Sequence, residues 1–206
     1  MSVPTTQHPV PYYSQWESRT LVPEFITGQL DAADDPLWQK SGADTPQEYA
    51  FWARRMCGVA CLRMALDFWR HQVPPSVPLV RDLYEAGAYV RDGNTVKGLI
   101  YAPFAEYVAE RWGMEAKAVP HLPAALVQET IESGRLALLS VHKTVRTPEV
   151  DPPNKGGHLV LAVGSTKEGV MLHNPSGLPG VSQEFAVVPW LTFDRFYAKR
   201  GVIIGE

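Results

Sequence analysis

The spacing of apolar residues changes near Gly134, and this change constrains the fold more than any other feature of the 206-residue sequence. Before it, apolar residues recur at helical spacing. After it, short segments rich in β-forming residues are separated by Gly, Pro, Asn and Asp. Helices followed by strands are typical of α+β proteins. The sequence therefore predicts an α+β fold in which an N-terminal helical half packs on a C-terminal antiparallel sheet.

Two neighbouring helices carry the clearest signals in the first half. The stretch TPQEYAFWARR begins with Thr45 as a candidate N-cap, Pro46 at the first helical position and Glu48 as the partner in a capping box. The following stretch, CGVACLRMALDFWRH at 57–71, carries apolar residues around most of its circumference, which predicts a buried helix. Further helices are expected at 77–86, 99–111 and 122–133.

Short segments rich in Val, Leu and aromatic residues predict the strands. They are VPYYSQW at 10–16 and, after the change of period, the segments 135–142, 157–164, 169–174 and 183–188. The polar segment 17–44 is expected to be a loop or an insertion. A chain of this length with 45% hydrophobic residues can bury a full core, so we expect a single domain over residues 1–206.

Charge and composition argue against several classes of partner. The formal net charge is −3, and no run of Lys and Arg with interleaved aromatic residues occurs, so neither nucleic acid nor an anionic membrane surface is an expected partner. The N-terminus lacks the basic and apolar regions of a secretory signal, and the longest apolar runs are too short to cross a bilayer. We therefore expect a cytoplasmic protein.

Cys57 is the candidate nucleophile. It stands at the start of the predicted buried helix, where unpaired backbone N–H groups and the positive end of the helix dipole favour a thiolate. Buried cysteines more often only fill space in a core, a role that suits Cys61 one turn later. Gly58 favours a special role for Cys57, because an early helical glycine costs stability unless another group must approach closely.

His158 and Asn174 are candidate partners of the thiol. His158 heads the strand GHLVLAVG, and an imidazole near a thiol can accept its proton. His173 and Asn174 point to opposite faces of the following strand, so only one of them can meet His158. A hairpin loop of three or five residues would pair residue 160 with 172 and place Asn174 opposite His158. A register shifted by one residue would present His173 or Pro175 instead.

An oxyanion that forms during attack on a carbonyl needs hydrogen-bond donors. The backbone N–H of Cys57 is one candidate, and the side-chain amide of Gln15 in VPYYSQW is the other.

The order Gln15, Cys57, His158, Asn174 resembles that of papain-like cysteine peptidases, and in particular the bacteriocin-processing, double-glycine leader peptidase-like family. The resemblance rests on VPYYSQ, on CGVACLRMAL where that family has a Cys-Gly helix with Met and Leu, on GGHLVLAVG, and on HNP about sixteen residues after the histidine. It spans nearly the whole chain. The motifs are moderately specific singly and more specific together.

The resemblance implies a papain-like fold, with the cysteine on a helix of one half and the histidine and asparagine on the sheet of the other. By position it assigns Cys57 as nucleophile, His158 as general base and then acid, Asn174 as the residue that orients the imidazole, and Gln15 as oxyanion donor. It implies no cofactor and no metal. The separation of Gln15 from Cys57 is longer than the family usually shows, which leaves Gln39 and Gln47 as alternatives.

The implied function is a cysteine-dependent hydrolase that cleaves a peptide or other amide through an acyl-thioester on Cys57, as in the maturation of a precursor peptide. An acyltransferase or peptide ligase would use the same acyl-enzyme but exclude water. A non-catalytic peptide-binding module on the same fold would not need Cys, His and Asn together. A metal site of Cys57, His142, His158 and His173 is the least favoured alternative.

The Pro-rich segment 143–156 lies directly before His158. We expect it to form a surface loop that borders the active-site cleft and shapes substrate choice, because loops on a rigid scaffold commonly carry that role. The segment 17–44 could cover the same cleft from the other side.

Overall fold

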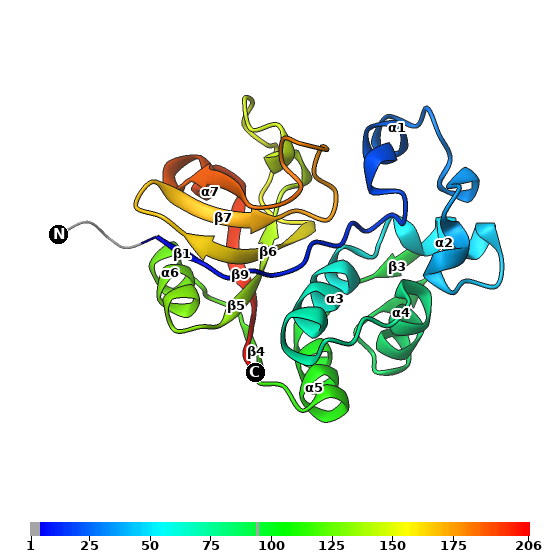
Figure 1. Ribbon diagram of the computed structural model, residues 1–206, viewed down its shortest axis with the longest axis horizontal. Helices are drawn as coiled ribbons and strands as arrows, with labels where there is room; N and C mark the ends of the chain where they lie inside the picture. Colours follow the sequence, from blue (N-terminus) through cyan, green and yellow to red (C-terminus); the bar gives the residue numbers. More distant parts are fainter. Residues whose placement is uncertain (1–4, 94) are drawn as a thin grey trace.

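The helices of the first half and the sheet of the second half lie side by side in the computed structural model, which describes residues 5–93 and 95–206 (Figure 1). Helices α1 to α5 occupy one half, and the sheet with helices α6 and α7 occupies the other. The predicted α+β architecture is confirmed. Within the described residues, no helix combines the length and the hydropathy needed to cross a bilayer.

The main sheet is antiparallel, and nearly all of its strands come from the second half of the chain. Its order is β4-β9-β5-β6-β7-β8, with β1 paired to the end of β6. The strands are β1 (Thr6–Gln7), β4 (Ala116–Val119), β5 (Leu136–Val141), β6 (His158–Ser165), β7 (Gly169–His173), β8 (Ala186–Pro189) and β9 (Tyr197–Ile204). A separate hairpin is formed by β2 (Val90–Asp92) and β3 (Thr95–Lys97).

The helices that the sequence predicts, α2 to α6, lie close to their expected positions. The α-helices are α1 (Val22–Thr27), α2 (Pro46–Ala53), α3 (Cys57–Arg70), α4 (Ser76–Glu85), α5 (Tyr101–Trp112), α6 (Ala124–Glu132) and α7 (Trp190–Phe196). Helices α1 and α7 and strands β4 and β9 were not expected from the sequence. Strand β9 has the sequence YAKRGVII, in which two charged residues and a glycine interrupt the apolar pattern.

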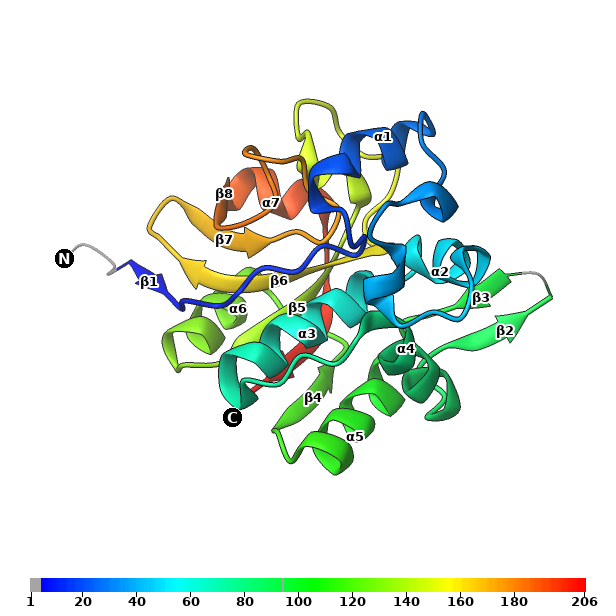
Figure 2. The same cartoon turned by 45° about the vertical axis from the view of Figure 1, so that its right-hand side comes forward.

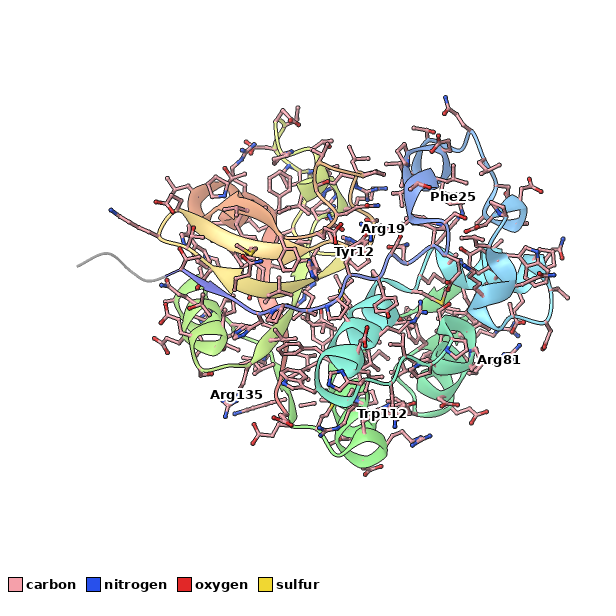
Figure 3. The ribbon with its side chains drawn as sticks, viewed as in Figure 1. Tyr12, Arg19, Phe25, Arg81, Trp112 and Arg135 are labelled. Carbon is pink, nitrogen blue, oxygen red and sulfur yellow. The ribbon has the colours of Figure 1, made fainter. Side chains whose placement is uncertain are left out.

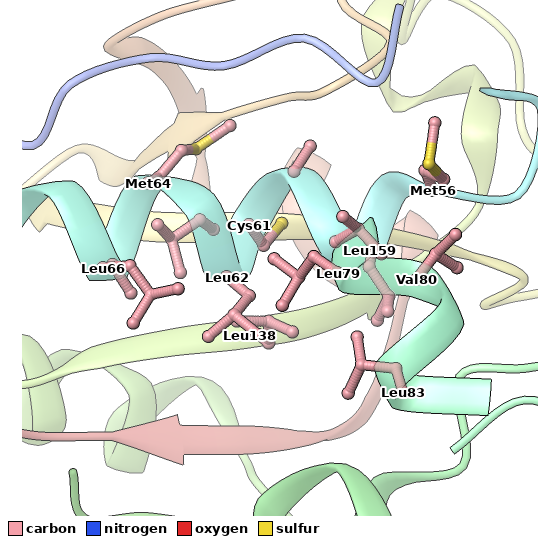
Figure 4. Packing of buried hydrophobic residues seen from close by; sticks show 14 of the residues in the cluster. Met56, Cys61, Leu62, Met64, Leu66, Leu79, Val80, Leu83, Leu138 and Leu159 are labelled. Carbon is pink, nitrogen blue, oxygen red and sulfur yellow. The ribbon is translucent and has the colours of Figure 1, made fainter. Parts of the chain in front are cut away.

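Each face of the sheet carries its own hydrophobic cluster. Successive residues of β5 and β6 alternate between the two clusters, as the period of two in a strand requires. Helix α3 packs on one face against β5 and β6, with Leu62 near Leu138 and Leu159 of the sheet (Figure 4). Helices α6 and α7 cover the other face. The central strands are therefore buried on both sides.

Helix α3 is buried along most of its length, as its sequence predicts. All residues from Gly58 to Leu66 are buried, including Arg63, and Cys61 packs in the core as expected. The helix ends at His71, which adopts a left-handed conformation with φ 51°. Truncating a core leucine such as Leu66 to alanine costs about 2–5 kcal/mol in comparable helices.

At the N-terminus of α2, one of the two hydrogen bonds of the predicted capping box is present and the other has a different donor. The Glu48 N–H donates to Thr45 Oγ1 over 3.1 Å, which confirms the N-cap. The Glu48 carboxylate accepts from the N–H of Asp44, not of Thr45, at 2.8 Å. Glu48 also pairs with Arg81 of α4, which draws the carboxylate away from the expected capping-box geometry.

The segment 17–44 is not the loop that its polarity predicts. It contains α1 and short 3-10 turns, and it packs on the helical half through buried residues such as Phe25, which stacks on Trp16 with ring centroids 5.6 Å apart. A fully buried carboxylate, Asp35, holds the segment to α2. It accepts from Ser18 Oγ at 2.5 Å and from the Tyr49 hydroxyl at 2.6 Å.

The predicted strand at 10–16 is also wrong. These residues are extended but form no ladder, because Pro9 and Pro11 lack the N–H groups that a strand donates. Instead they run between the two halves (Figure 2). The Tyr12 ring lies at this junction beneath the Arg19 guanidinium, 4.7 Å from ring centroid to Cζ (Figure 3).

Candidate active site

Cys57 is the first residue of α3, and no side chain caps this helix end. The first α-helical hydrogen bond runs from the Ala60 N–H to the Met56 carbonyl, so the N–H groups of Cys57 and Gly58 lie free of the helix ladder. Such groups can bind a developing negative charge. The helix thus presents a thiol and backbone donors at one place.

Gly58 allows this helix end to approach the sheet closely. A Cβ built on Gly58 would lie 3.0 Å from Leu99 Cδ2 and 3.1 Å from Leu159 Cδ1. Leu159 is the residue after His158 in β6. The glycine therefore brings the thiol next to the strand that carries the imidazole, as the sequence suggested.

His158 and Asn174 are in direct contact. The Nε2 atom of His158 lies 2.8 Å from Oδ1 of Asn174, and both residues are buried. Asn174 is itself fixed by its backbone: its N–H donates to the Gln183 carbonyl at 2.7 Å, and its carbonyl accepts from the Tyr12 hydroxyl at 2.9 Å. Nδ1 of His158 has no hydrogen-bond partner within residues 5–93 and 95–206.

The contact forms although the predicted hairpin register is wrong. Leu161 lies opposite His173 and Ala162 opposite Leu172, and a bulge then shifts the register before Gly164 pairs with Met171. The strands continue to a tight turn in which the Thr166 N–H donates to the Gly169 carbonyl, so the loop is shorter than expected. At the His158 end, the observed register differs from the predicted register by an even number of residues. His158 and Asn174 therefore still point to the same face of the sheet.

Ser176 joins this pair, although no sequence pattern singles it out. Its Oγ lies 3.0 Å from His158 Nε2, and its N–H donates to Asn174 Oδ1 at 3.1 Å. Ser176 lies in the turn sequence NPSG, whose composition is explained by turn formation alone. The structure thus adds a hydroxyl to the polar group around the imidazole.

His173 lies apart from this group. Its Nε2 is 2.8 Å from the Val10 carbonyl, its Nδ1 accepts from the Phe185 N–H at 3.1 Å, and its ring packs between Tyr12 and Phe185. Both ring nitrogens are therefore occupied. His142, another residue of the alternative metal site, bonds Thr144 through Nδ1 at 2.8 Å. The described residues contain no cluster of three or more His, Cys, Asp or Glu residues arranged to hold a metal ion.

Gln15 lies at the site, whereas Gln39 and Gln47 are exposed elsewhere. The Gln15 side-chain Nε2 donates to the Ala53 carbonyl at 2.9 Å, and its backbone N–H donates to the Pro175 carbonyl at 3.0 Å. The other N–H of the Gln15 side-chain amide makes no hydrogen bond within the described part of the chain. Its Oε1 is buried and has no partner in the described part of the chain.

Two cavities meet at Cys57 and His158. The larger, of about 530 Å³, is also lined by Gln15 and Ser176, and the smaller, of about 390 Å³, by Leu99 and other residues. The segments 17–44 and 143–156 both reach the larger cavity, as expected. A substrate that occupied both cavities would pass directly over the thiol and the imidazole.

Burial determines the protonation of both groups. It raises the pKa of the Cys57 thiol, and this outweighs the opposing effect of the backbone N–H groups of Leu159, Gly58 and Cys57. It lowers the pKa of His158 to about 4, against the favourable hydrogen bond to Asn174. The free protein therefore holds a neutral thiol and a neutral imidazole at pH 7. The N–H groups of the helix end lower the thiol pKa in the expected direction, but desolvation is the larger effect and raises the pKa overall.

Solved structures show which known fold this is. The chain is similar to a protein from Bacillus anthracis described as a C39-like peptidase, with a TM-score of 0.58, 12% identity, and 99% and 98% of the two chains covered. It is also similar to the peptidase domain of Streptococcus ComA, a bifunctional ABC transporter involved in a quorum-sensing pathway. There the TM-score is 0.51 at 14% identity, and 74% of this chain and 92% of that chain are covered.

The chain has the C39 peptidase fold. The fold expected from the resemblance is thereby confirmed. No family model and no curated protein sequence matches the chain. At 12–14% identity the C39 likeness concerns the fold, and the chemistry of the site depends on its own residues.

Proposed function

We propose that this protein is a cysteine peptidase or amidase, with Cys57 as nucleophile, His158 as base and acid, Asn174 as the residue that orients the imidazole, and Gln15 as an oxyanion donor. The observation that carries the proposal is that a thiol at a free helix end and an imidazole bound to Asn174 through Nε2 line the same two cavities. The C39 fold of the neighbours supports a peptidase-type reaction.

The first step begins from the neutral pair. Nδ1 of His158 takes the thiol proton as Cys57 Sγ attacks the carbonyl carbon of the scissile amide. The carbonyl oxygen becomes an oxyanion, which the Cys57 N–H and the remaining amide N–H of Gln15 stabilise. When the C–N bond breaks, the leaving nitrogen takes the proton from His158, and an acyl-thioester remains on Cys57.

The second step releases the acyl group. His158 Nδ1 removes a proton from water as the water oxygen attacks the thioester, and it returns that proton to the departing Cys57 sulfur. The products are a carboxylic acid and the free thiol. Asn174 keeps the ring in one orientation through both steps, since its Oδ1 accepts from Nε2–H and leaves Nδ1 available as the base.

A peptide is the proposed substrate, and a precursor peptide that is cut during maturation is its proposed kind. The ComA domain belongs to a transporter with a role in quorum sensing, which is a peptidase setting consistent with this proposal.

Trapping the acyl-enzyme tests the proposal. Incubation with a peptide library, followed by mass spectrometry of the intact protein, should reveal a hydroxylamine-sensitive adduct on Cys57. The adduct and peptide cleavage should be absent in Cys57→Ala and His158→Ala and retained in Cys61→Ala, whose thiol lies one turn away in the core. Cleavage that survives Cys57→Ala would refute the proposal.

A further inference from the structure

The larger cavity beside the thiol has an unusual charge. Four of its lining residues are cationic, namely Arg54, Arg55, Lys143 and Arg146. No Asp or Glu among the described residues lines it, although the chain contains 22 acidic residues and has a net charge of −3. Positive charge is therefore concentrated at the candidate active site of an acidic protein.

Both halves of the molecule supply these cations. Arg54 and Arg55 follow the end of α2, between this helix and Cys57. Lys143 and Arg146 lie on a 3-10 turn between β5 and β6. The His142 side chain caps that turn by accepting from the Thr144 N–H. The cations thus lie on the short connection between α2 and Cys57 and on the 3-10 turn that follows β5.

The four cations are free of ion pairs within the described part of the chain. Other arginines are paired: Arg19 with Glu184, Arg63 with Glu17, and Arg81 with Glu48. By contrast, Arg146 Nε donates to the Lys143 carbonyl at 2.8 Å, and Arg55 lies over the Phe51 ring at 4.4 Å. These contacts position the guanidinium groups without neutralising them.

Arg146 in particular is exposed only in part. Burial lowers the pKa of its guanidinium, and no carboxylate of the described chain offsets the loss of solvation. Its charge also reaches the imidazole: after burial, and against the bond to Asn174, Arg146 helps to lower the pKa of His158. An anionic group bound near Arg146 would therefore lie in the same cavity as Cys57 and His158.

We propose that the cavity lined by Arg54, Arg55, Lys143 and Arg146 binds carboxylate groups of the substrate, so that the protein acts on acidic peptides with these groups close to the scissile amide. The proposal rests on the proposed function and names its substrate class. A peptide fits better than a nucleic acid, because the four cations line one cavity of about 530 Å³ and the chain as a whole has a net charge of −3.

Binding to Cys57→Ala tests the proposal without requiring turnover. Three short peptides of one sequence are compared by fluorescence anisotropy with an uncharged dye: one with Glu side chains and an amidated C-terminus, one with Gln and a free C-terminus, and one with Gln and an amidated C-terminus. A carboxylate peptide should bind roughly tenfold more tightly than the uncharged one. The first two peptides show whether side chains or the C-terminus supply the carboxylate.

Variants in this background locate the binding. The preference should be lost in Lys143→Gln/Arg146→Gln and reduced in Arg54→Gln/Arg55→Gln. Lys167→Gln should keep it, because Lys167 is an exposed cation without an ion pair in the described chain, at the opposite end of β6 from His158. The preference should also shrink as NaCl is raised from about 0.05 M to about 0.5 M, because salt screens partly exposed charges.

Three results would overturn the proposal: equal affinity for all three peptides, a preference that survives both double variants, or tighter binding of a short single-stranded oligonucleotide than of either carboxylate peptide. Alkylation separates this proposal from the proposed function. The rate with iodoacetate relative to iodoacetamide, normalised to glutathione, should be higher at Cys57 and should fall in Lys143→Gln/Arg146→Gln. Absence of both the Cys57 acyl-enzyme and peptide cleavage would refute the nucleophile, whereas the comparison of the three peptides in Cys57→Ala decides the carboxylate preference independently.

Discussion

His158 Nε2 lies 2.8 Å from Asn174 Oδ1, yet these two residues are not partners across the hairpin that carries them. His158 is the first residue of β6, and Asn174 directly follows the last residue of β7. Asn174 lies opposite the position in β6 that comes two residues after His158. The contact is diagonal and is completed by Ser176. The imidazole is thus held by a turn as much as by a sheet.

This arrangement predicts different effects of Asn174→Ala and Ser176→Ala. Loss of the Asn174 amide leaves the buried Nε2–H with only the weaker acceptor at 3.0 Å. Such a loss costs about 1–3 kcal/mol, which corresponds to a fall of roughly 5- to 150-fold in kcat/KM. Ser176→Ala should cost less than Asn174→Ala, and the double variant should lose more than the two effects combined. Steady-state kinetics of all three variants check this; equal losses in the two single variants would contradict it.

The lowered pKa of His158 predicts a pH dependence of stability. Its pKa is about 4 in the folded protein and 6.5 in the absence of burial, so below about 6.5 the unfolded chain binds a proton that the folded chain does not. Above pH 6.5 the protonation of His158 does not reduce the free energy of unfolding. As pH falls from 6.5 towards 4, this free energy decreases by up to about 1.4 kcal/mol per pH unit. Denaturant unfolding of wild type and His158→Gln across this window should show a shallower slope in the variant. Identical slopes would show that His158 is not the group responsible.

Gln15→Ala should reduce the rate more than the stability. Loss of one oxyanion donor typically lowers kcat by about 10²–10³-fold. Gln15 also donates to the Ala53 carbonyl, so a small fall in Tm is expected as well. Gln47→Ala is the matched control, because Gln47 is exposed on α2 and does not line the cavity. A kcat within a factor of about two of wild type would remove Gln15 from the proposed mechanism.

Gly58→Ala should leave the protein folded but impair the site. Alanine improves helix propensity by about 1 kcal/mol, whereas overpacking against Leu99 and Leu159 costs about 1–3 kcal/mol. Together these effects lower the free energy of unfolding by no more than about 2 kcal/mol. The added methyl group nevertheless pushes the helix end that carries Cys57 away from β6, so kcat/KM should fall while Tm changes little. A large loss of Tm with normal kcat/KM in the remaining folded protein would contradict this account.

Asp35→Ala should loosen the segment 17–44. Asp35 is fully buried and accepts from Ser18, Leu37 and Tyr49, so its removal leaves several donors unsatisfied at a cost of about 1–3 kcal/mol each for the most buried. Limited proteolysis should cut the segment sooner than in wild type. KM should rise, because Ile26 and Thr27 of this segment line the larger cavity. The neighbouring exposed Asp34→Ala serves as the control and should change neither property.

The sequence predicts the alternation of faces better than it predicts register. Because side chains alternate along a strand, His158 and Asn174 share a face in any register that differs from the predicted one by an even number of residues. The observed register differs in this way, so the two residues share a face. Register depends on the turn and on the bulge near Gly164, where a Cβ would meet the Thr6 carbonyl at 2.6 Å. That contact comes from a segment distant in sequence, so no local pattern encodes it.

Tertiary pairing and prolines account for the elements that were missed or wrongly predicted. Strand β9 is recruited by β4 and β5 on either side, and tertiary pairing overrides its charged residues. The segment 10–16 has the composition of a strand, but Pro11 within it and Pro9 just before it lack the N–H groups that a ladder requires. Ser176 and the four cavity cations have surface-like sequence contexts, and only the fold brings them to Cys57 and His158.

The distance in sequence between Cys57 and His158 has a consequence for the making of the protein. During synthesis the helix that carries the thiol leaves the ribosome about a hundred residues before the strand that carries the imidazole. The orienting amide of Asn174 and the Ser176 hydroxyl follow later still. A growing chain therefore holds the Cys57 thiol with no imidazole beside it until β6 has been made.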